Sequence, residues 1–197
     1  MYGRPSRASR LRAVVIARVL MLVALTALVA GCGNKIETRT VGETEGLYID
    51  VGELRYQVQV SRILNPDDIE DRHYLEGLPA GTVEPTAEEA WFGVWLRVQN
   101  STSDQTLVPS DDFHIVDTQE QEFEPVELEG NPFAYTPERL GPNTVLPNSE
   151  SPAGQGPVQG ALLLFKLTND ALQNRPLEFK IHSPEAPDDI GIVDLDI

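Results

Sequence analysis

The chain contains few cysteines and methionines, the residues that form disulfides and bind soft metals through sulfur. Its 197 residues include one cysteine, Cys32, and two methionines, Met1 and Met21. A single cysteine excludes a disulfide within the chain and any site built from several thiolates. Because both methionines precede Cys32, the rest of the chain has no thioether site for copper(I). Sulfur chemistry is therefore not expected beyond Cys32 itself.

Hydrophobic runs long enough to cross a membrane are also lacking. The most apolar stretch near the N-terminus, residues 19–30, contains twelve residues without a charge. A helix needs about 20 apolar residues to cross a hydrocarbon core of roughly 30 Å. Five arginines and no acidic residue lie within the first 31 residues. A basic region followed by a short apolar region is typical of a secretory signal peptide.

The cysteine lies directly after this apolar region. The segment Leu28-Val29-Ala30-Gly31-Cys32 resembles the lipobox of bacterial lipoprotein precursors. The resemblance implies cleavage before Cys32, a diacylglycerol on its thiol and then acylation of the new N-terminus. Two or more acyl chains anchor a protein stably, whereas one chain anchors it marginally. We predict a signal peptide over residues 1–31 and a lipid anchor at Cys32; an ordinary secretory signal or an uncleaved anchor is the alternative.

Basic residues become scarce once this signal is removed. The mature chain would keep ten Lys and Arg against 31 Asp and Glu, a formal charge of −21. Nucleic acid and anionic lipid headgroups repel such a surface, so we expect no nucleic-acid partner. The surface suits cations and basic partners. We favour the simpler interpretation, a solvated acidic coat on a protein outside the cytoplasm.

The mature chain has the periodicity of short strands. Residues 32–47 are polar and rich in Thr, Glu and Gly, which predicts a flexible tether. Alternating apolar residues then predict about seven strands within residues 48–197. Two proline-containing stretches, 65–90 and 129–157, are predicted loops, the first with one helical turn and the second either functional or mobile. The pattern predicts an all-β fold, an antiparallel β-sandwich.

Several motifs resemble a known family. Val98-Gln99-Asn100, the segment Asp112–Asp117 and the Gly156–Gly160 segment before an apolar strand occur in a familiar order. They are similar to the immunoglobulin-like domain of unknown function found in exported lipoproteins of Gram-positive bacteria. The resemblance covers roughly residues 50–182. It implies an Ig-like sandwich at the cell envelope and no catalytic residues, although residues 65–90 and 129–157 are longer than the family pattern.

Metal-binding residue types form no recognisable motif. The three histidines, His73, His114 and His182, are far apart in sequence, and we expect them to be isolated on the surface or in turns. His114 alternates with Phe113 and Ile115, so its side chain is expected on the opposite face of that strand. We predict no metal or cofactor from this set.

An acidic cluster is the other weak metal candidate. It gathers four carboxylates within five residues: Asp67, Asp68, Glu70 and Asp71. Calcium prefers 6–8 oxygen ligands, which such a cluster could supply in part. The glycine and the terminal glutamate of an EF-hand loop are missing, so we favour a solvated acidic loop.

Aromatic residues supply the candidate partner surface. Trp91 and Trp95 share a strand face with Arg97, a combination that could stack on sugars or grip a peptide. The interpretation we favour is that one tryptophan fills the core between two sheets. Phe133 and Tyr135, in the 129–157 loop, either contact a partner or pin the loop to the sandwich.

Enzymatic motifs are lacking. There is no G-x-S-x-G, and Ser149 and Ser151 have no histidine nearby in sequence. We therefore predict a non-enzymatic lipoprotein of the cell envelope, with an Ig-like domain that contacts a protein or a cell-wall component outside the cytoplasm. The alternative is a lipoprotein that binds a transported solute or a cation.

Overall fold

The computed structural model describes residues 40–186 and 188–195. The predicted signal peptide, the predicted lipidation of Cys32 and the first part of the predicted tether lie outside the described residues. Within the described ranges, each helix is too short or too polar to span a bilayer.

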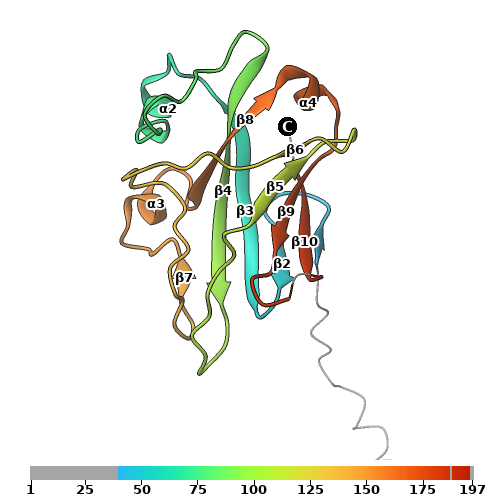
Figure 1. The fold of residues 1–197 in the computed structure, drawn as a ribbon. Coiled ribbons are helices and arrows are strands. Elements are labelled where there is room, and N and C mark those ends of the chain that lie inside the picture. Colours follow the sequence, from blue (N-terminus) through green and yellow to red (C-terminus); the bar gives the residue numbers. More distant parts are fainter. Residues whose placement is uncertain (1–39, 187, 196–197) are drawn as a thin grey trace, which may run out of the picture. The chain divides into compact units, whose positions relative to one another are not determined.

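Two sheets form from the alternating segments, and they confirm the predicted β-sandwich (Figure 1). The β9 sheet has the order β1-β10-β9-β5-β6, and the β4 sheet has β3 on one side of β4 and both β7 and β8 on the other. Its remaining strand, β2, pairs with β3. The strands of the β9 sheet are β1 (Val41–Gly42), β5 (Phe113–Val116), β6 (Glu122–Phe123), β9 (Leu177–His182) and β10 (Ile190–Leu195). Those of the β4 sheet are β2 (Tyr48–Val51), β3 (Leu54–Leu64), β4 (Glu89–Asn100), β7 (Val145–Leu146) and β8 (Ala161–Thr168).

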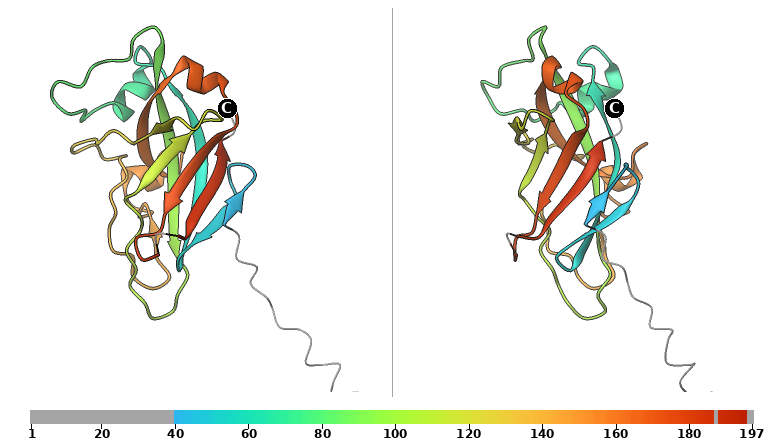
Figure 2. Two further views of the ribbon diagram at one scale, coloured as in Figure 1. Left: turned by 45° about the vertical axis from the view of Figure 1, so that its right-hand side comes forward. Right: turned by 90° about the vertical axis from the view of Figure 1, so that its right-hand side faces the viewer.

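The main core lies between the two sheets. In Figure 2, β9 and β10 (red) lie in front of β3 and β4 (cyan and green). Alternate residues of each strand face inward, as the period of two requires. Phe92, Leu96 and Phe165 from the β4 sheet and Phe179 from the β9 sheet are all fully buried there. Phe165 and Phe179 meet edge to face with ring centroids 6.3 Å apart.

Within the described residues, three short helices lie between strands. They are α2 (Ile69–Tyr74), α3 (Pro152–Gln155) and α4 (Asn169–Gln173). Each begins at an oxygen-bearing residue whose side chain accepts backbone N–H groups: Asp68, Ser151 and Thr168. Such N-caps satisfy donors that a short helix cannot pair internally. The predicted helical turn between residues 65 and 90 is thus confirmed as α2.

The domain begins earlier than the sequence predicts. Residues 40–47 fall within the predicted tether, but β1 pairs in parallel with β10, Val41 opposite Ile192. Further along, the amide of Gly46 donates to the carbonyl of Val58 at 2.8 Å, and the Glu45 carboxylate accepts hydrogen bonds from the amide and the hydroxyl of Ser61. This segment is polar, but its backbone pairs with the edge of a sheet. The predicted tether boundary at residue 47 is therefore wrong.

The 129–157 loop is fastened to the sandwich along its length. Leu140 and Leu107 form an isolated bridge, and Ala134 bridges to Leu162. The buried amide of Asn100 donates to the carbonyls of Leu140 and Gly141. These hydrogen bonds hold the 129–157 loop in one conformation over the β4 sheet, although the loop contains no long strand.

Candidate functional site

Both tryptophans are buried, each only 1% exposed. They do not lie between the sheets, as we expected for a core tryptophan, but on the outer face of the β4 sheet. There they form a second apolar cluster with Leu64, Tyr74, Leu162 and Leu164. Helix α2 covers this cluster: Tyr74 meets the Trp95 ring edge to face at 5.1 Å. Trp91 and Trp95 are thus unavailable as a partner surface, because the 65–90 segment packs over them.

Two glycines make room for Trp95. A side-chain carbon on Gly93 would lie 2.8 Å from the Trp95 ring, and one on Gly160 would lie 2.9 Å from its Cβ. Contacts this short do not occur between carbon atoms without a shift of one group. The glycine at position 160, part of the motif that resembles the lipoprotein family, therefore has a packing reason here.

Phe133 and Tyr135 are half-buried and pin the 129–157 loop. Phe133 packs on the outer cluster and meets the Tyr74 ring at 5.1 Å. Tyr135 packs on the main core against Phe113, also at 5.1 Å, and its hydroxyl donates to the carbonyl of Ser110. Both side chains therefore act as anchors of the loop, which is the second of the two roles considered from sequence.

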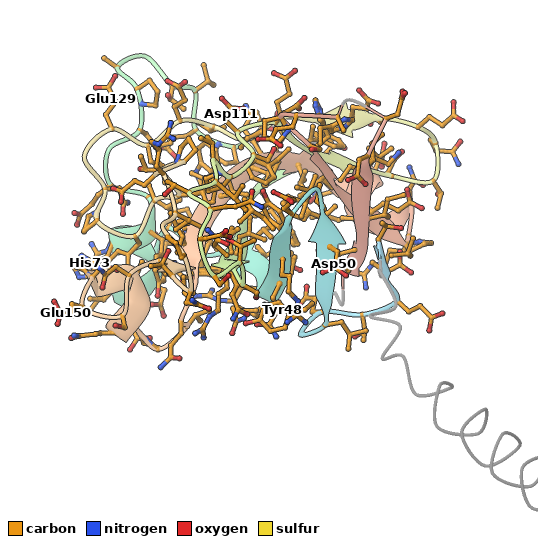
Figure 3. All side chains as sticks on the ribbon, turned by 90° about the horizontal axis from the view of Figure 1, so that it is seen from below. Tyr48, Asp50, His73, Asp111, Glu129 and Glu150 are labelled. Atoms are coloured by element: carbon orange, nitrogen blue, oxygen red, sulfur yellow. The ribbon has the colours of Figure 1, made fainter. Side chains whose placement is uncertain are left out.

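Two of the four carboxylates in the acidic cluster stabilise the local structure. Asp68 caps α2, and Asp71 is paired with Arg62 at 2.5 Å and 3.0 Å. The hydrogen bond from Arg62 is the main cause that lowers the pKa of the Asp71 carboxyl below its usual value. Asp67 and Glu70 are exposed. The cluster does not converge on one point, so its residues are explained by capping, pairing and solvation. More widely, acidic side chains such as Glu129 and Glu150 project from the periphery (Figure 3).

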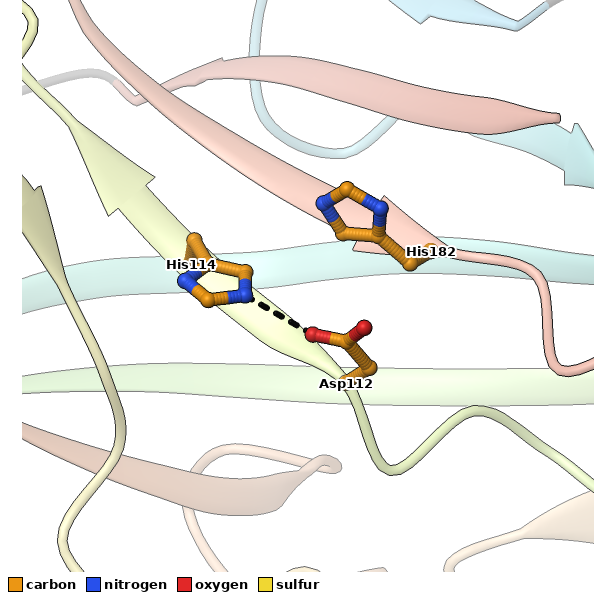
Figure 4. Close-up of side chains that lie close together, drawn as sticks. All are labelled: Asp112, His114 and His182. Carbon is orange, nitrogen blue, oxygen red and sulfur yellow. Dashed lines mark hydrogen bonds and ion pairs between the residues drawn. The ribbon is translucent and has the colours of Figure 1, made fainter. Parts of the chain in front are cut away.

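Two histidines come together that the sequence leaves 68 residues apart. His114 on β5 and His182 at the end of β9 meet edge to face with ring centroids 5.3 Å apart. Asp112 joins them, and its carboxylate lies 2.8 Å from Nε2 of His114 (Figure 4). One potential ligand atom from each of the three residues lies within 4.8 Å of the other two. The expectation of isolated histidines is wrong for this pair, although His114 does lie on the face opposite Phe113 and Ile115, as predicted.

A buried polar network holds the strand ends that carry this cluster. Ser110, fully buried, accepts a hydrogen bond from the Asp112 amide at 3.0 Å and donates from its hydroxyl to the His182 carbonyl at 2.6 Å. Its own amide donates to the hydroxyl of Tyr56. Burial raises the pKa of Tyr56 to about 12 and also raises the pKa of Tyr135, so both phenols stay neutral. The network thus fixes Asp112 beside His182.

A polar cavity lies on the outer face of the β4 sheet, further along β4 than Trp95. It has a volume of about 690 Å³. Arg97 of β4 lines it, together with amide and hydroxyl side chains of the 143–159 segment, namely Asn143, Thr144, Asn148, Ser149, Gln155 and Gln159. We call it the Arg97 cavity. Arg97 is the only charged residue in its lining.

Local bonds shape the wall of the Arg97 cavity. Pairing of β7 with β4, Leu146 opposite Val98, brings residues 143–149 beside Arg97. Ser151 caps α3 and donates to the carbonyl of Asn148 at 2.7 Å. A side chain on Gly154 would collide with that carbonyl at 2.1 Å, so only glycine fits there. The wall is therefore built by specific contacts.

The Arg97 guanidinium has no partner among the described residues. Its Nε is buried and makes no hydrogen bond, and no carboxylate of the described ranges pairs with it. Arg97 differs from the exposed arginines that lack a carboxylate partner among the described residues, such as Arg139, because its Nε is buried. Its position beside Trp95 on one strand face was visible in the sequence. The cavity was not, because its opposite wall comes from residues some 50 positions further on.

No family model matches the chain, and no curated protein matches it. Three solved structures are similar in part. The yjhA protein of Bacillus subtilis is 11% identical, with a TM-score of 0.47 over 78% of this chain and 99% of that one. The ycdA protein of Bacillus subtilis, a candidate lipoprotein by its description, is 10% identical with a TM-score of 0.44 over 80% of this chain and 39% of that one.

The third is an uncharacterised β-sandwich protein of Clostridium difficile 630, 9% identical with a TM-score of 0.42 over 83% of this chain and all of that one. This chain spans about two fifths of the ycdA structure. Similarity at these identities and TM-scores does not assign the chain to a family or an activity. The architecture of this chain rests on its own two sheets.

Proposed function

We propose that this protein is a non-enzymatic lipoprotein of the cell envelope whose β-sandwich binds a partner outside the cytoplasm. The lipobox-like segment ending at Cys32 supports the location, and so does the short apolar stretch before it. The order of motifs between residues 50 and 182 supports membership of the Ig-like lipoprotein family. The hydroxyl of Ser151, used in capping α3, supports a structural rather than a nucleophilic role for that serine.

The observation that carries the binding role is the unpaired guanidinium of Arg97 in its cavity. A volume of about 690 Å³ lies within the range of roughly 300–1,000 Å³ that ligand sites occupy. An arginine presents a planar set of donors that matches a carboxylate in a two-point contact. The surrounding amides and hydroxyls can bond further polar groups. The cavity therefore suits a ligand that combines one carboxylate with several amides or hydroxyls.

Cell-wall peptides have this chemistry, because they carry free carboxylates along an amide backbone. The net negative charge of the chain disfavours ligands with many negative charges and leaves Arg97 as the attraction within the cavity. We therefore assign the Arg97 cavity to a carboxylate-bearing peptide of the cell wall.

Binding of soluble cell-wall fragments tests this assignment. Isothermal titration of purified, enzymatically released fragments into the full chain should give saturable binding. Arg97→Gln should weaken it about tenfold to a hundredfold, since a hydrogen bond to a charged group contributes about 1.5–3 kcal/mol. Arg139→Gln removes an equal charge from an exposed position outside the cavity and should leave the affinity unchanged. Equal weakening by both variants would mean that general charge, not the cavity, attracts the fragments.

The alternative function is that of a cation-binding lipoprotein. A histidine-containing group supports it, and the acidic loop does not. Asp68 and Asp71 of that loop are occupied in capping and pairing. The grouping of Asp112, His114 and His182 has the donor types that a cation needs.

A further inference from the structure

We propose that Asp112, His114 and His182 form a binding site for one divalent transition-metal ion, of the Zn²⁺ class. The site lies on the outer face of the β9 sheet, away from the Arg97 cavity on the β4 sheet. It goes beyond partner binding and does not depend on it.

The three side chains converge without any change of the backbone. Zinc takes nitrogen and oxygen ligands at about 2.0–2.2 Å, which places neighbouring ligand atoms of one ion roughly 3–3.5 Å apart. The Asp112 carboxylate and Nε2 of His114 are separated by 2.8 Å, and all three candidate ligand atoms lie within 4.8 Å of one another. Rotation of the side chains about their own bonds is enough to close the set around one ion.

The backbone under the site is held by pairing and by buried hydrogen bonds. The His182 amide donates to the Asp112 carbonyl at 3.1 Å, so these two residues stand opposite each other on neighbouring strands. His114 follows two residues after Asp112 and so points to the same face. Ser110 bonds to the backbone of both Asp112 and His182 from within the core. Ligands supported by such a network keep their spacing, which is what a metal site requires.

The donor set selects the class of ion. Two imidazoles with one carboxylate suit Zn²⁺, Ni²⁺ or Cu²⁺, whereas Ca²⁺ prefers 6–8 oxygen atoms. Three protein ligands leave a fourth position for water or for a group of a partner. A positive charge also lies on this sheet: Lys180 is opposite His114 in the strand register and is paired with Glu178 at 3.6 Å. The net negative charge of the chain favours a cation at any such site.

The His114 ring presents one of its two nitrogens to the site. Its Nδ1 is buried and has no hydrogen-bond partner, while its Nε2 faces Asp112. Burying a polar nitrogen without a partner costs free energy, so folded proteins rarely leave one. Burial of Nδ1 therefore costs the folded protein free energy that a solvent-exposed histidine would not cost. Nε2, which faces Asp112, is therefore the ligand atom that this ring offers to an ion.

Titration of Zn²⁺ into the full chain tests the site. The chain carries no polyhistidine tag, and any free Cys32 thiol is alkylated beforehand. Calorimetry should show one Zn²⁺ per chain and no binding of Ca²⁺. His182→Ala and Asp112→Asn should each weaken Zn²⁺ at least tenfold. His73→Ala is the matched control: His73 is exposed on α2, outside the proposed site, and pairs with Glu76, so its loss should leave the affinity unchanged.

A readout in the unaltered protein guards against variants that fail to fold. Addition of Ni²⁺ should broaden the ring signals of His114 and His182 in the nuclear magnetic resonance spectrum before that of His73. Absence of stoichiometric Zn²⁺ binding would overturn the proposal. Equal weakening by His182→Ala and His73→Ala, or selective broadening of His73, would overturn it as well.

Discussion

The charged side chain of Asp71 is held by several partners. Its carboxylate is 8% exposed and accepts hydrogen bonds from Arg62 and from the amide of Asn65 at 2.8 Å. It thereby ties the start of α2 to the end of β3. Since α2 carries Tyr74, this pair also positions the ring that covers Trp95. A single buried carboxylate thus links the acidic loop to the outer apolar cluster.

Replacing this carboxylate should destabilise the domain. Asp71→Asn is expected to lower the free energy of unfolding by about 1–3 kcal/mol at pH 7, because hydrogen bonds to a charged group are lost. Urea unfolding followed by tryptophan fluorescence measures the change. Asp67→Asn is the control, since Asp67 is exposed, and should alter stability far less. Equal losses in both variants would contradict the role given to Asp71.

The same pair predicts a pH dependence with a definite sign. Because Arg62 holds the pKa of the folded Asp71 below its unfolded value of about 3.9, the charged pair stabilises the domain above that pH. The contribution is lost as the pH falls through the folded pKa. The difference in stability between the natural chain and Asp71→Asn should therefore shrink below about pH 4. A difference that stays constant down to pH 2 would contradict this account.

At the scale of elements, the longer strands were predictable and the shorter pairings were not. The alternation in residues 54–60 and 91–99 predicts β3 and β4, and each is confirmed. β1 and β7 contain two residues each, too few for any period to be visible. Their places depend on partners far along the chain, Ile192 for Val41 and Val98 for Leu146.

The candidate sites show the same limit more strongly. The sequence shows that Trp91 and Trp95 share a face, but not that α2 folds back over that face. It shows that His114 points away from the core, but not that β5 pairs with β9 and so brings in His182. Contacts between distant segments decide both outcomes, and local periodicity carries no signal for them.

The correction to the tether leads to a prediction about β1. A chain beginning at residue 38 should melt at the same temperature as the mature chain. A chain beginning at residue 48 should melt several degrees lower, since it loses the pairing of β1 with β10 and the contact of Glu45 with Ser61. Differential scanning calorimetry measures both. Identical melting of the two shortened chains would show that residues 40–47 contribute nothing to the fold.

At the scale of the whole molecule, the two faces of the sandwich differ. The outer face of the β4 sheet carries the buried aromatic cluster and the Arg97 cavity. The outer face of the β9 sheet carries the Asp112, His114 and His182 group. The chain as a whole has about twice as many acidic as basic residues. The proposed partner and the proposed ion would therefore bind on opposite sheets and could be bound at once.

The proposed location depends on Cys32, and the mass of the mature N-terminus tests it most directly. The chain is extracted from membranes of a bacterium that expresses the full sequence, digested and examined by mass spectrometry. We predict an N-terminal peptide that begins at Cys32 and carries a diacylglycerol on its sulfur. A mature chain that begins at another residue, or an unmodified Cys32 in membrane-bound protein, would contradict the lipid anchor.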